Sequence, residues 1–172
     1  MSRHRFMIIF VLAALLLGSA GCAPAQPPPA KAEMRSTPPP WDAPRHAVAN
    51  IDAAGLEHQP LDMIDNQRLL QLEVTIDGVP VTIPAFVGID RLRALQGSAH
   101  THDESGQVWL EGTEANTVTL GQFFTLWGVR FDAECLGAAC GGVTVTADGA
   151  PVADPIGLVM ASSSEIRVAG TS

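Results

Sequence analysis

Positively charged residues are scarce in this chain. Lysine and arginine number 10 among 172 residues, against 18 aspartates and glutamates. Arg3 and Arg5 belong to an N-terminal segment with the layout of an export signal, so the remaining chain has 8 basic and 18 acidic residues and a net charge of −10. Such a surface repels phosphate backbones, and we therefore expect no nucleic-acid partner.

The familiar catalytic motifs are also missing. The sequence has no glycine-rich phosphate loop and no H-E-x-x-H zinc motif, and no elbow motif surrounds the serines at 162–164. Carboxylate pairs such as Glu111 and Glu114 arise by chance in an acidic chain. We therefore predict a protein that is not an enzyme.

The apolar run at the N-terminus is too short to be a comfortable transmembrane helix. It extends from Phe6 to Leu17, follows two arginines and precedes the small residues Gly18 to Gly21. This three-part layout is typical of a bacterial signal peptide. We predict a signal peptide at 1–21 and export of the remaining chain.

Cys22 is the expected anchor. The Ala20-Gly21-Cys22 end of the signal is similar to the lipobox of bacterial lipoproteins, in which the cysteine is diacylated, although Ser19 stands where that pattern usually has leucine. Several acyl chains hold a protein firmly on a bilayer. We expect a lipid-anchored protein on the extracytoplasmic face of the cell membrane. The alternative is ordinary cleavage near Ala20 or Ala25, which would leave a secreted protein.

Prolines dominate the next segment. Residues 23–46 hold eight of the 13 prolines and show little apolar periodicity. Polyproline stretches are extended and semi-rigid. We predict a disordered tether at 22–58 and a single domain at 59–172. Trp41 would either dock back on the domain or make no specific contact.

Alternating residues predict a β-hairpin at the start of the domain. Apolar side chains alternate with polar ones from Leu70 to Ile76, and Asp77-Gly78 then suits a two-residue turn. We predict the return strand at 79–83. Pro80 and Pro84 remove two backbone donors, which favours the edge of a sheet.

The hairpin pattern recurs 71 residues later, where 145–155 matches 74–84 at seven of eleven positions, with Asp148-Gly149 at the turn. This is either a trace of two similar halves or a pair of edge hairpins that solve one turn problem in the same way. We predict further strands at 107–111 and 165–169.

One helix is clearly indicated. Thr119 and Gln122 fit a capping box, in which two side chains satisfy backbone donors reciprocally, and Gly128 is a natural stop. Between them, an apolar stripe at helical spacing consists of Leu120, Phe123, Phe124 and Trp127. We predict an α+β fold, a small and mostly antiparallel β-sheet domain with this one amphipathic helix packed on it.

Metal-ligand side chains are concentrated in one segment, His100-Thr101-His102-Asp103-Glu104. On a strand, His100 and His102 would share one face and could reach a single metal ion, with Asp103 or Glu104 supplying an oxygen from the following turn. Imidazole with carboxylate suits zinc, copper or nickel. The alternative is a polar loop whose histidines form local hydrogen bonds.

Cys135 and Cys140 remain as an even pair once Cys22 is acylated. Such a pair closes in an oxidising compartment, and we predict a short structural disulfide. Metal thiolates or a redox couple are the alternatives, although the spacing is wider than the C-x-x-C of thiol oxidoreductases.

Two motifs in this order resemble a family of uncharacterised exported bacterial lipoproteins, mainly actinobacterial. They are His100-Thr101-His102-Asp103 and Thr119-Leu120-Gly121-Gln122-Phe123-Phe124 with Trp127-Gly128. Members often carry further histidines where this chain has Leu69, Gln71 and Trp109. The resemblance implies a site at His100 and His102 that lacks part of a full metal centre here, and it implies no particular activity.

The leading hypothesis is a membrane-anchored protein with a non-catalytic binding role, in which His100, His102 and Asp103 bind copper or zinc. The alternative is a cell-envelope protein-interaction module that adds a partner's strand to its own edge strand at 79–83. A weaker alternative is a thiol-active accessory factor that uses Cys135 and Cys140.

Overall fold

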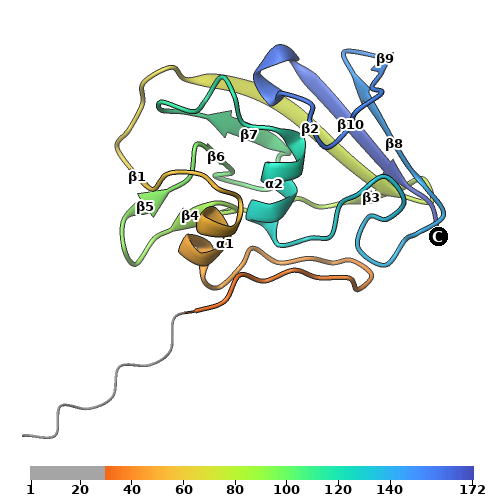
Figure 1. The fold of residues 1–172 in the computed structure, drawn as a ribbon, viewed down its shortest axis with the longest axis horizontal. Coiled ribbons are helices and arrows are strands. Elements are labelled where there is room, and N and C mark those ends of the chain that lie inside the picture. Colours follow the sequence, from red (N-terminus) through yellow and green to blue (C-terminus); the bar gives the residue numbers. More distant parts are fainter. Residues whose placement is uncertain (1–29) are drawn as a thin grey trace, which may run out of the picture.

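The fold is shown in Figure 1, a computed structural model that describes residues 30–172. The predicted signal peptide at 1–21 and the predicted anchor Cys22 lie outside the described residues. Within the described range, no helix has the length and apolar character needed to cross a membrane. The structure combines short helices with mixed β-sheets, which is the α+β class predicted from the sequence.

The main sheet has seven strands. They are β2 (Arg68–Ile76), β3 (Val79–Val81), β6 (Ala99–His100), β7 (Gln107–Leu110), β8 (Val143–Ala147), β9 (Ala150–Pro151) and β10 (Glu165–Gly170). Their order is β6-β7-β2-β10-β8-β9, and β3 pairs with β2 beyond the end of β7. The β2 and β10 strands are parallel, whereas the other pairs are antiparallel, so the sheet is mostly antiparallel as predicted.

A smaller sheet lies at the end of the molecule away from the C-terminus (Figure 1). It consists of β1 (Gln59–Pro60), β5 (Leu95–Gln96) and β4 (Ile89–Asp90), paired in that order. A short 3-10 helix, η1 (Met160–Ser162), precedes β10.

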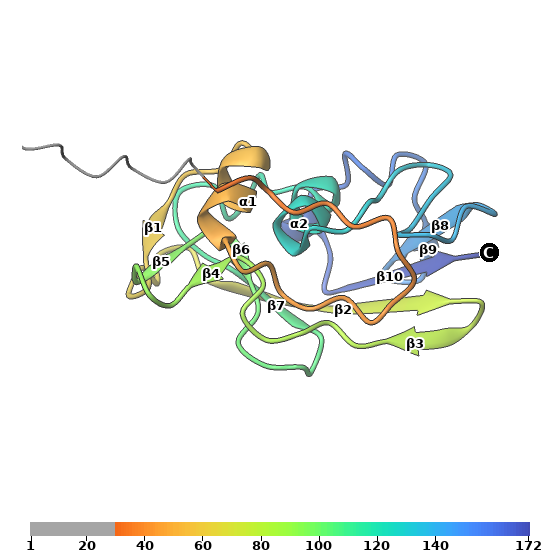
Figure 2. The same cartoon turned by 90° about the horizontal axis from the view of Figure 1, so that it is seen from below.

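The helix predicted from the apolar stripe is α2 (Leu120–Trp127). Thr119 and Gln122 form the predicted capping box, and Gly128 ends the helix with a φ of 69°, a left-handed conformation that glycine adopts easily. The apolar stripe of α2 is fully buried and belongs to the same hydrophobic cluster as Leu70, Leu72 and Val74 of β2. The core therefore lies between one face of the main sheet and α2, and Figure 2 shows both helices on that side.

The prediction of a disordered tether is wrong for residues 30–58, because this segment packs on the domain. Trp41 is only 2% exposed, and its ring meets the ring of Trp127 edge-on at a centroid distance of 5.6 Å. The Trp127 indole N–H donates to the Trp41 carbonyl, 3.0 Å away. The proline count indicated disorder, but burial of one large aromatic ring favours docking strongly enough to overcome it.

A second helix, α1 (Ala47–Ala53), was also missed within this segment. Its fully buried Asn50 joins two distant parts of the chain, because the side-chain amide donates to the carbonyls of Glu33 at 2.9 Å and Thr125 at 2.8 Å. The amide oxygen accepts from the Glu33 N–H in return. The folded domain thus begins near residue 30 rather than at 59.

Both predicted Asp-Gly turns are present. The φ angles are 50° and 78° at Asp77-Gly78 and 48° and 82° at Asp148-Gly149, so the central residues of both turns are left-handed. The return strand β3 ends at Val81, two residues earlier than predicted, because Ile83 turns into the core, where it is 3% exposed. Both hairpins lie at edges, since β3 and β9 each pair with one strand among the described residues.

Candidate functional site

The β6, β7 and β2 strands place three side chains in a row on the face of the main sheet away from α2. His100 pairs with Trp109, and Trp109 pairs with Leu69. Directly opposite residues of antiparallel strands point to the same side, opposite to the buried Val108 and Leu110. Trp109 is therefore the direct neighbour of His100 on this face, and Leu69 lies one strand further on.

His100 is fully buried although it lies on this outer face. Its Nδ1 is 3.2 Å from the Gly97 carbonyl oxygen, which can only accept, so Nδ1 carries the proton and Nε2 presents a lone pair. Burial lowers the pKa of His100 to about 4, outweighing the Gly97 hydrogen bond and the charge of Glu111, which act in the opposite direction. The imidazole is therefore neutral at pH 7.

Glu111 faces this lone pair. Its Oε2 is 3.5 Å from His100 Nε2, and its side chain is 5% exposed. The separation would suit an ion pair with a protonated imidazole, but the lowered pKa of His100 disfavours that form. Among the described residues, Nε2 has no hydrogen-bond partner. A lone pair thus meets a carboxylate oxygen, and this contact is repulsive unless a proton or a cation lies between them.

Two amide side chains hold the Glu111 carboxylate in place. Gln67 donates to Oε1, and Gln96 donates to Oε2 at 3.1 Å. The backbone N–H of Glu111 also donates to the Ser98 carbonyl at 3.0 Å. These partners come from the residue before β2, from β5 and from the segment before β6, so Glu111 is oriented from several sides.

Ser98 extends these contacts to a second carboxylate. Its hydroxyl donates to Glu114 Oε2 at 3.3 Å and accepts from the side-chain amide of Gln59. A Cβ at Gly112, where φ is 84°, would lie 1.9 Å from Gln59 Oε1, so only glycine fits there. We call these residues the polar cluster: Gln59, Gln67, Gln96, Ser98, His100, Glu111 and Glu114.

The structure brings the two predicted histidines together. The exposed ring of His102 lies edge-on to His100, with centroids 5.0 Å apart, and contacts Trp109 at 5.1 Å. Asp103 instead accepts a hydrogen bond from the Ser105 N–H at 2.9 Å, and hydrogen bonds to Ser105 lower its pKa. No three histidine, cysteine, aspartate or glutamate residues of the described chain form a group that could hold a metal ion. The predicted set of His100, His102 and Asp103 is thus not assembled as a three-ligand centre.

Sequence reasoning missed Glu111 as a partner of His100. The sequence indicated part of this contact. Glu111 is two residues after Trp109, so on a strand the two side chains point to the same face of the sheet. What the sequence did not reveal is the register between β6 and β7, which places Trp109 opposite His100.

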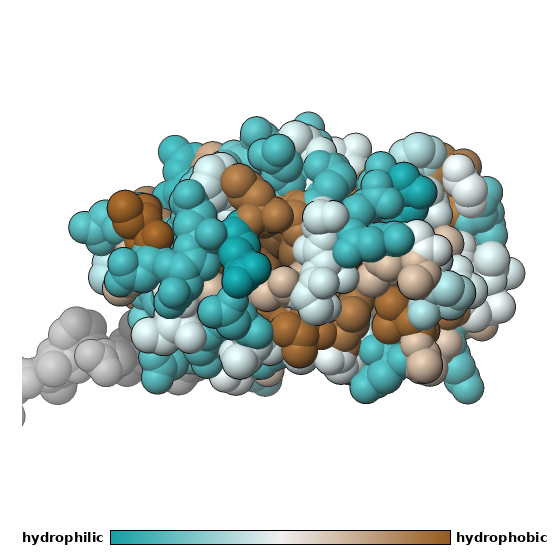
Figure 3. Space-filling model, turned by 90° about the horizontal axis from the view of Figure 1, so that it is seen from above, coloured by the Kyte–Doolittle hydropathy of each residue, from teal (hydrophilic) through white to brown (hydrophobic). Residues whose placement is uncertain are grey.

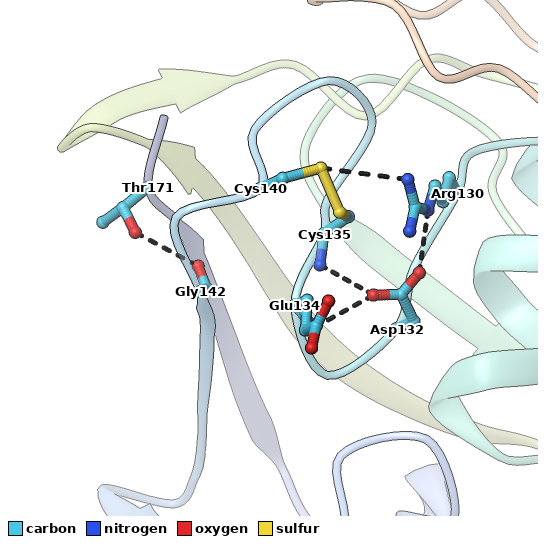
Figure 4. The surroundings of a disulfide bond; sticks show 7 residues. All are labelled: Arg130, Asp132, Glu134, Cys135, Cys140, Gly142 and Thr171. Atoms are coloured by element: carbon cyan, nitrogen blue, oxygen red, sulfur yellow. Dashed lines mark hydrogen bonds and ion pairs between the residues drawn. A yellow bond between two sulfur atoms is a disulfide. The ribbon is translucent and has the colours of Figure 1, made fainter.

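The predicted disulfide is present between Cys135 and Cys140, with an S–S distance of 2.08 Å (Figure 4). Asp132 accepts from the N–H groups of Glu134 and Cys135 at 2.9 Å and 2.8 Å, which closes the turn before the bridge. The bonded sulfurs are therefore not available as thiolate ligands. The bridge stabilises a loop near the C-terminal end, away from β6 (Figure 1).

Comparison of this chain with protein-family models, with curated proteins and with solved structures finds no match. The resemblance to exported lipoproteins therefore stays a prediction, and the geometry around His100 is the basis for a functional assignment.

Proposed function

We propose that this protein is a membrane-anchored, extracytoplasmic binding protein that holds a divalent transition-metal cation between His100 Nε2 and Glu111 Oε2. The observation that carries the proposal is the buried Nε2 atom, which has no hydrogen-bond partner within residues 30–172 and faces a carboxylate oxygen. A cation at this point would replace a repulsive contact by two attractive ones.

The separation of the two atoms suits metal coordination. Bonds of about 2.1 Å that meet at a tetrahedral angle separate their outer atoms by about 3.4 Å. The observed distance from Nε2 to Oε2 is 3.5 Å. The separation of the two atoms is therefore compatible with one tetrahedral ion bound by both.

The surroundings of both ligands are those that metal sites require. Metal-bound histidines donate their other ring N–H to a fixed acceptor, as Nδ1 of His100 does to Gly97. The ligating carboxylate is also held by hydrogen bonds, here from Gln67 and Gln96. Because His100 is neutral at pH 7, the ion does not compete with a proton for Nε2.

Two protein ligands leave coordination positions open. The exposed ring of His102 lies edge-on to His100, and its side chain would have to rotate to become a third ligand. Structural zinc sites have four protein ligands, whereas open sites exchange ions and ligands. We therefore assign a role in reversible ion binding, with zinc or copper as the ions that prefer imidazole with carboxylate.

The extracytoplasmic location is part of the proposal and rests on Cys22 and the segment before it. The closed Cys135–Cys140 bridge supports an oxidising compartment. A role that uses free thiols would require reduction of this bridge.

Titration with Co²⁺, whose visible absorption reports tetrahedral coordination, tests the metal proposal on protein purified without a histidine tag. We expect His100→Gln and Glu111→Gln each to weaken binding about tenfold or more, the range typical of a lost ligand or ligand partner. His58→Gln is the matched control, because exposed His58 also pairs with a carboxylate, at 2.9 Å from Asp52. Asp103→Asn should bind like the wild type.

The near-ultraviolet circular dichroism of the tryptophans verifies that each variant is folded, since Trp41 and Trp127 lie in the core. Folded His100→Gln and Glu111→Gln proteins that bind Co²⁺ as tightly as the wild type would rule out this site. In that case the His100–Glu111 contact would serve packing alone.

The edge strand β3 supports a second candidate, a protein-interaction module. Val79 is 65% exposed, and a surface hollow of about 470 Å³ lies beside β3 and Pro40. With only three residues and a proline at its centre, β3 offers few backbone groups for strand addition. Co-purification of an envelope protein with a metal-free domain would favour this candidate over metal binding.

A further inference from the structure

The end of the molecule that carries the small sheet presents apolar side chains to solvent. Leu92 is 101% exposed, Ile64 is 70% exposed and Leu61 is 39% exposed. Their two segments lie side by side, because the Leu61 N–H donates to the Ala94 carbonyl at 3.3 Å. Figure 3 shows an apolar projection among hydrophilic side chains at this end, on the left of the view.

Two arginines flank the most exposed of these residues. Arg91 and Arg93 lie on either side of Leu92 in a chain with few basic residues. The Arg91 guanidinium is 4.6 Å from the centroid of the Phe86 ring, and Arg93 pairs with Asp90 at 2.9 Å. An apolar tip between arginines is the composition of side chains that lie at a membrane interface, where the guanidinium groups meet lipid phosphates.

The chain enters the domain at this same end. Ala30, the first described residue, and Arg93 line one surface hollow of about 210 Å³. Cys22 is only eight residues before Ala30, and eight residues reach at most about 29 Å even when fully extended. An acyl group at Cys22 would therefore keep this end of the domain close to the bilayer.

We propose that this end of the domain docks on the lipid bilayer, with Leu92 and Ile64 at the level of the headgroups. The proposal rests on acylation of Cys22, which is part of the proposed function. One or two apolar side chains bind a membrane weakly, but a short tether raises the effective concentration of the surface to the millimolar range. Asp62 and Asp65 lie in the same segment as Ile64 and keep the insertion shallow.

Fluorescence quenching by brominated lipids tests the docking. The full-length acylated protein is reconstituted in vesicles of phosphatidylcholine with a minor fraction of phosphatidylglycerol, either with or without bromine on the acyl chains. Leu92→Trp is compared with Val79→Trp, an exposed apolar position in β3 at the opposite end of the molecule (Figure 1). Wild-type protein supplies the emission of Trp41, Trp109 and Trp127 for subtraction.

We expect bromine to reduce the added emission of Leu92→Trp about twofold or more, since an interfacial residue lies next to the acyl chains, and to leave that of Val79→Trp unchanged. Equal quenching of the two variants would overturn the docking. Mass spectrometry of the N-terminal peptide and flotation of the vesicles report on the anchor separately. Acylated, floating protein with an unquenched Leu92→Trp would refute docking alone, whereas protein without acyl chains would refute both the anchor and the docking.

Discussion

Two histidine–carboxylate pairs lie in the described part of the chain, and they differ in burial. His58 and Asp52 form a hydrogen bond of 2.9 Å, with side chains 34% and 65% exposed. His100 and Glu111 are 3.5 Å apart, with side chains 0% and 5% exposed. Water can solvate every group of the exposed pair, whereas the buried pair depends on what the fold supplies. The comparison teaches that the same residue types form an ordinary surface contact in one place and a candidate site in the other.

Replacing the histidine of each pair should give the largest difference, measured as the loss in the free energy of unfolding. His100→Ala removes a fully buried side chain, so it leaves a cavity and deprives the Gly97 carbonyl oxygen of its donor, and we expect a loss of about 3–5 kcal/mol in the free energy of unfolding. His58→Ala should cost less than about 1 kcal/mol, because its pair is exposed. Urea denaturation of the metal-free proteins measures both. Equal losses would mean that burial does not distinguish the two pairs.

The second-largest difference between the two pairs is expected in how the free energy of unfolding depends on pH. The pKa of His100 is about 4 when folded, against 6.5 for an exposed histidine, so between these values the unfolded chain binds a proton that the folded chain does not. Stability from this residue is therefore fully present above pH 6.5 and decreases as the pH falls toward 4. The decrease is on the order of 3 kcal/mol, since one pKa unit is worth about 1.4 kcal/mol.

Urea midpoints measured from pH 7 to pH 4 test this dependence. His100→Gln should lose this part of the slope, whereas His58→Gln should retain it. A wild-type slope that persists in folded His100→Gln protein would assign the effect to other groups.

Removal of the disulfide should weaken the protein without affecting either pair. In the loop-entropy description, closing the few residues between Cys135 and Cys140 contributes about 2 kcal/mol. A Cys135→Ser, Cys140→Ser double variant should therefore unfold at lower urea concentration and still bind Co²⁺ like the wild type. Reduced Co²⁺ affinity in this folded variant would show that the His100 site depends on global stability rather than on its own ligands.

Glu111→Gln should change stability least. The neutral amide can donate to His100 Nε2, which replaces the lone-pair repulsion by a hydrogen bond, while its orientation toward Gln96 becomes less favourable. We expect the free energy of unfolding to stay within about 1 kcal/mol of the wild type. Urea denaturation measures this free energy. A decrease as large as that of His100→Ala would indicate that the carboxylate itself stabilises the metal-free fold.

The parts predicted correctly depend on interactions between neighbours in sequence. The capping box of Thr119 and Gln122 spans three residues, and the turns at Asp77-Gly78 and Asp148-Gly149 depend on the φ preferences of two residues each. The cysteine pair is five residues apart, so closure of that loop was also a local inference. His100 and His102 also lie side by side, but β6 ends at His100, so the alternation of a strand is not what brings them together.

The errors involve contacts between residues far apart in sequence. Proline content indicated a tether up to residue 58, but Trp41 docks against Trp127, and Asn50 bonds to Thr125. No local pattern in a proline-rich segment reveals whether a distant surface will accept its one large aromatic ring. Asp103 is the exception, because the contact that was missed is local: its carboxylate accepts from the N–H of Ser105, two residues later, instead of joining the histidines.

By itself, the sequence determined the α+β class, the two Asp-Gly hairpins, the limits of α2 and the disulfide, because each depends on short-range backbone preferences or on spacing along the chain. The tertiary structure alone decided that His100 is buried and that Glu111 faces it. That contact is fixed by the register between β6 and β7 and by the hydrogen bonds from Gln67 and Gln96 to Glu111. Both arise only when several segments that are distant in sequence pack together.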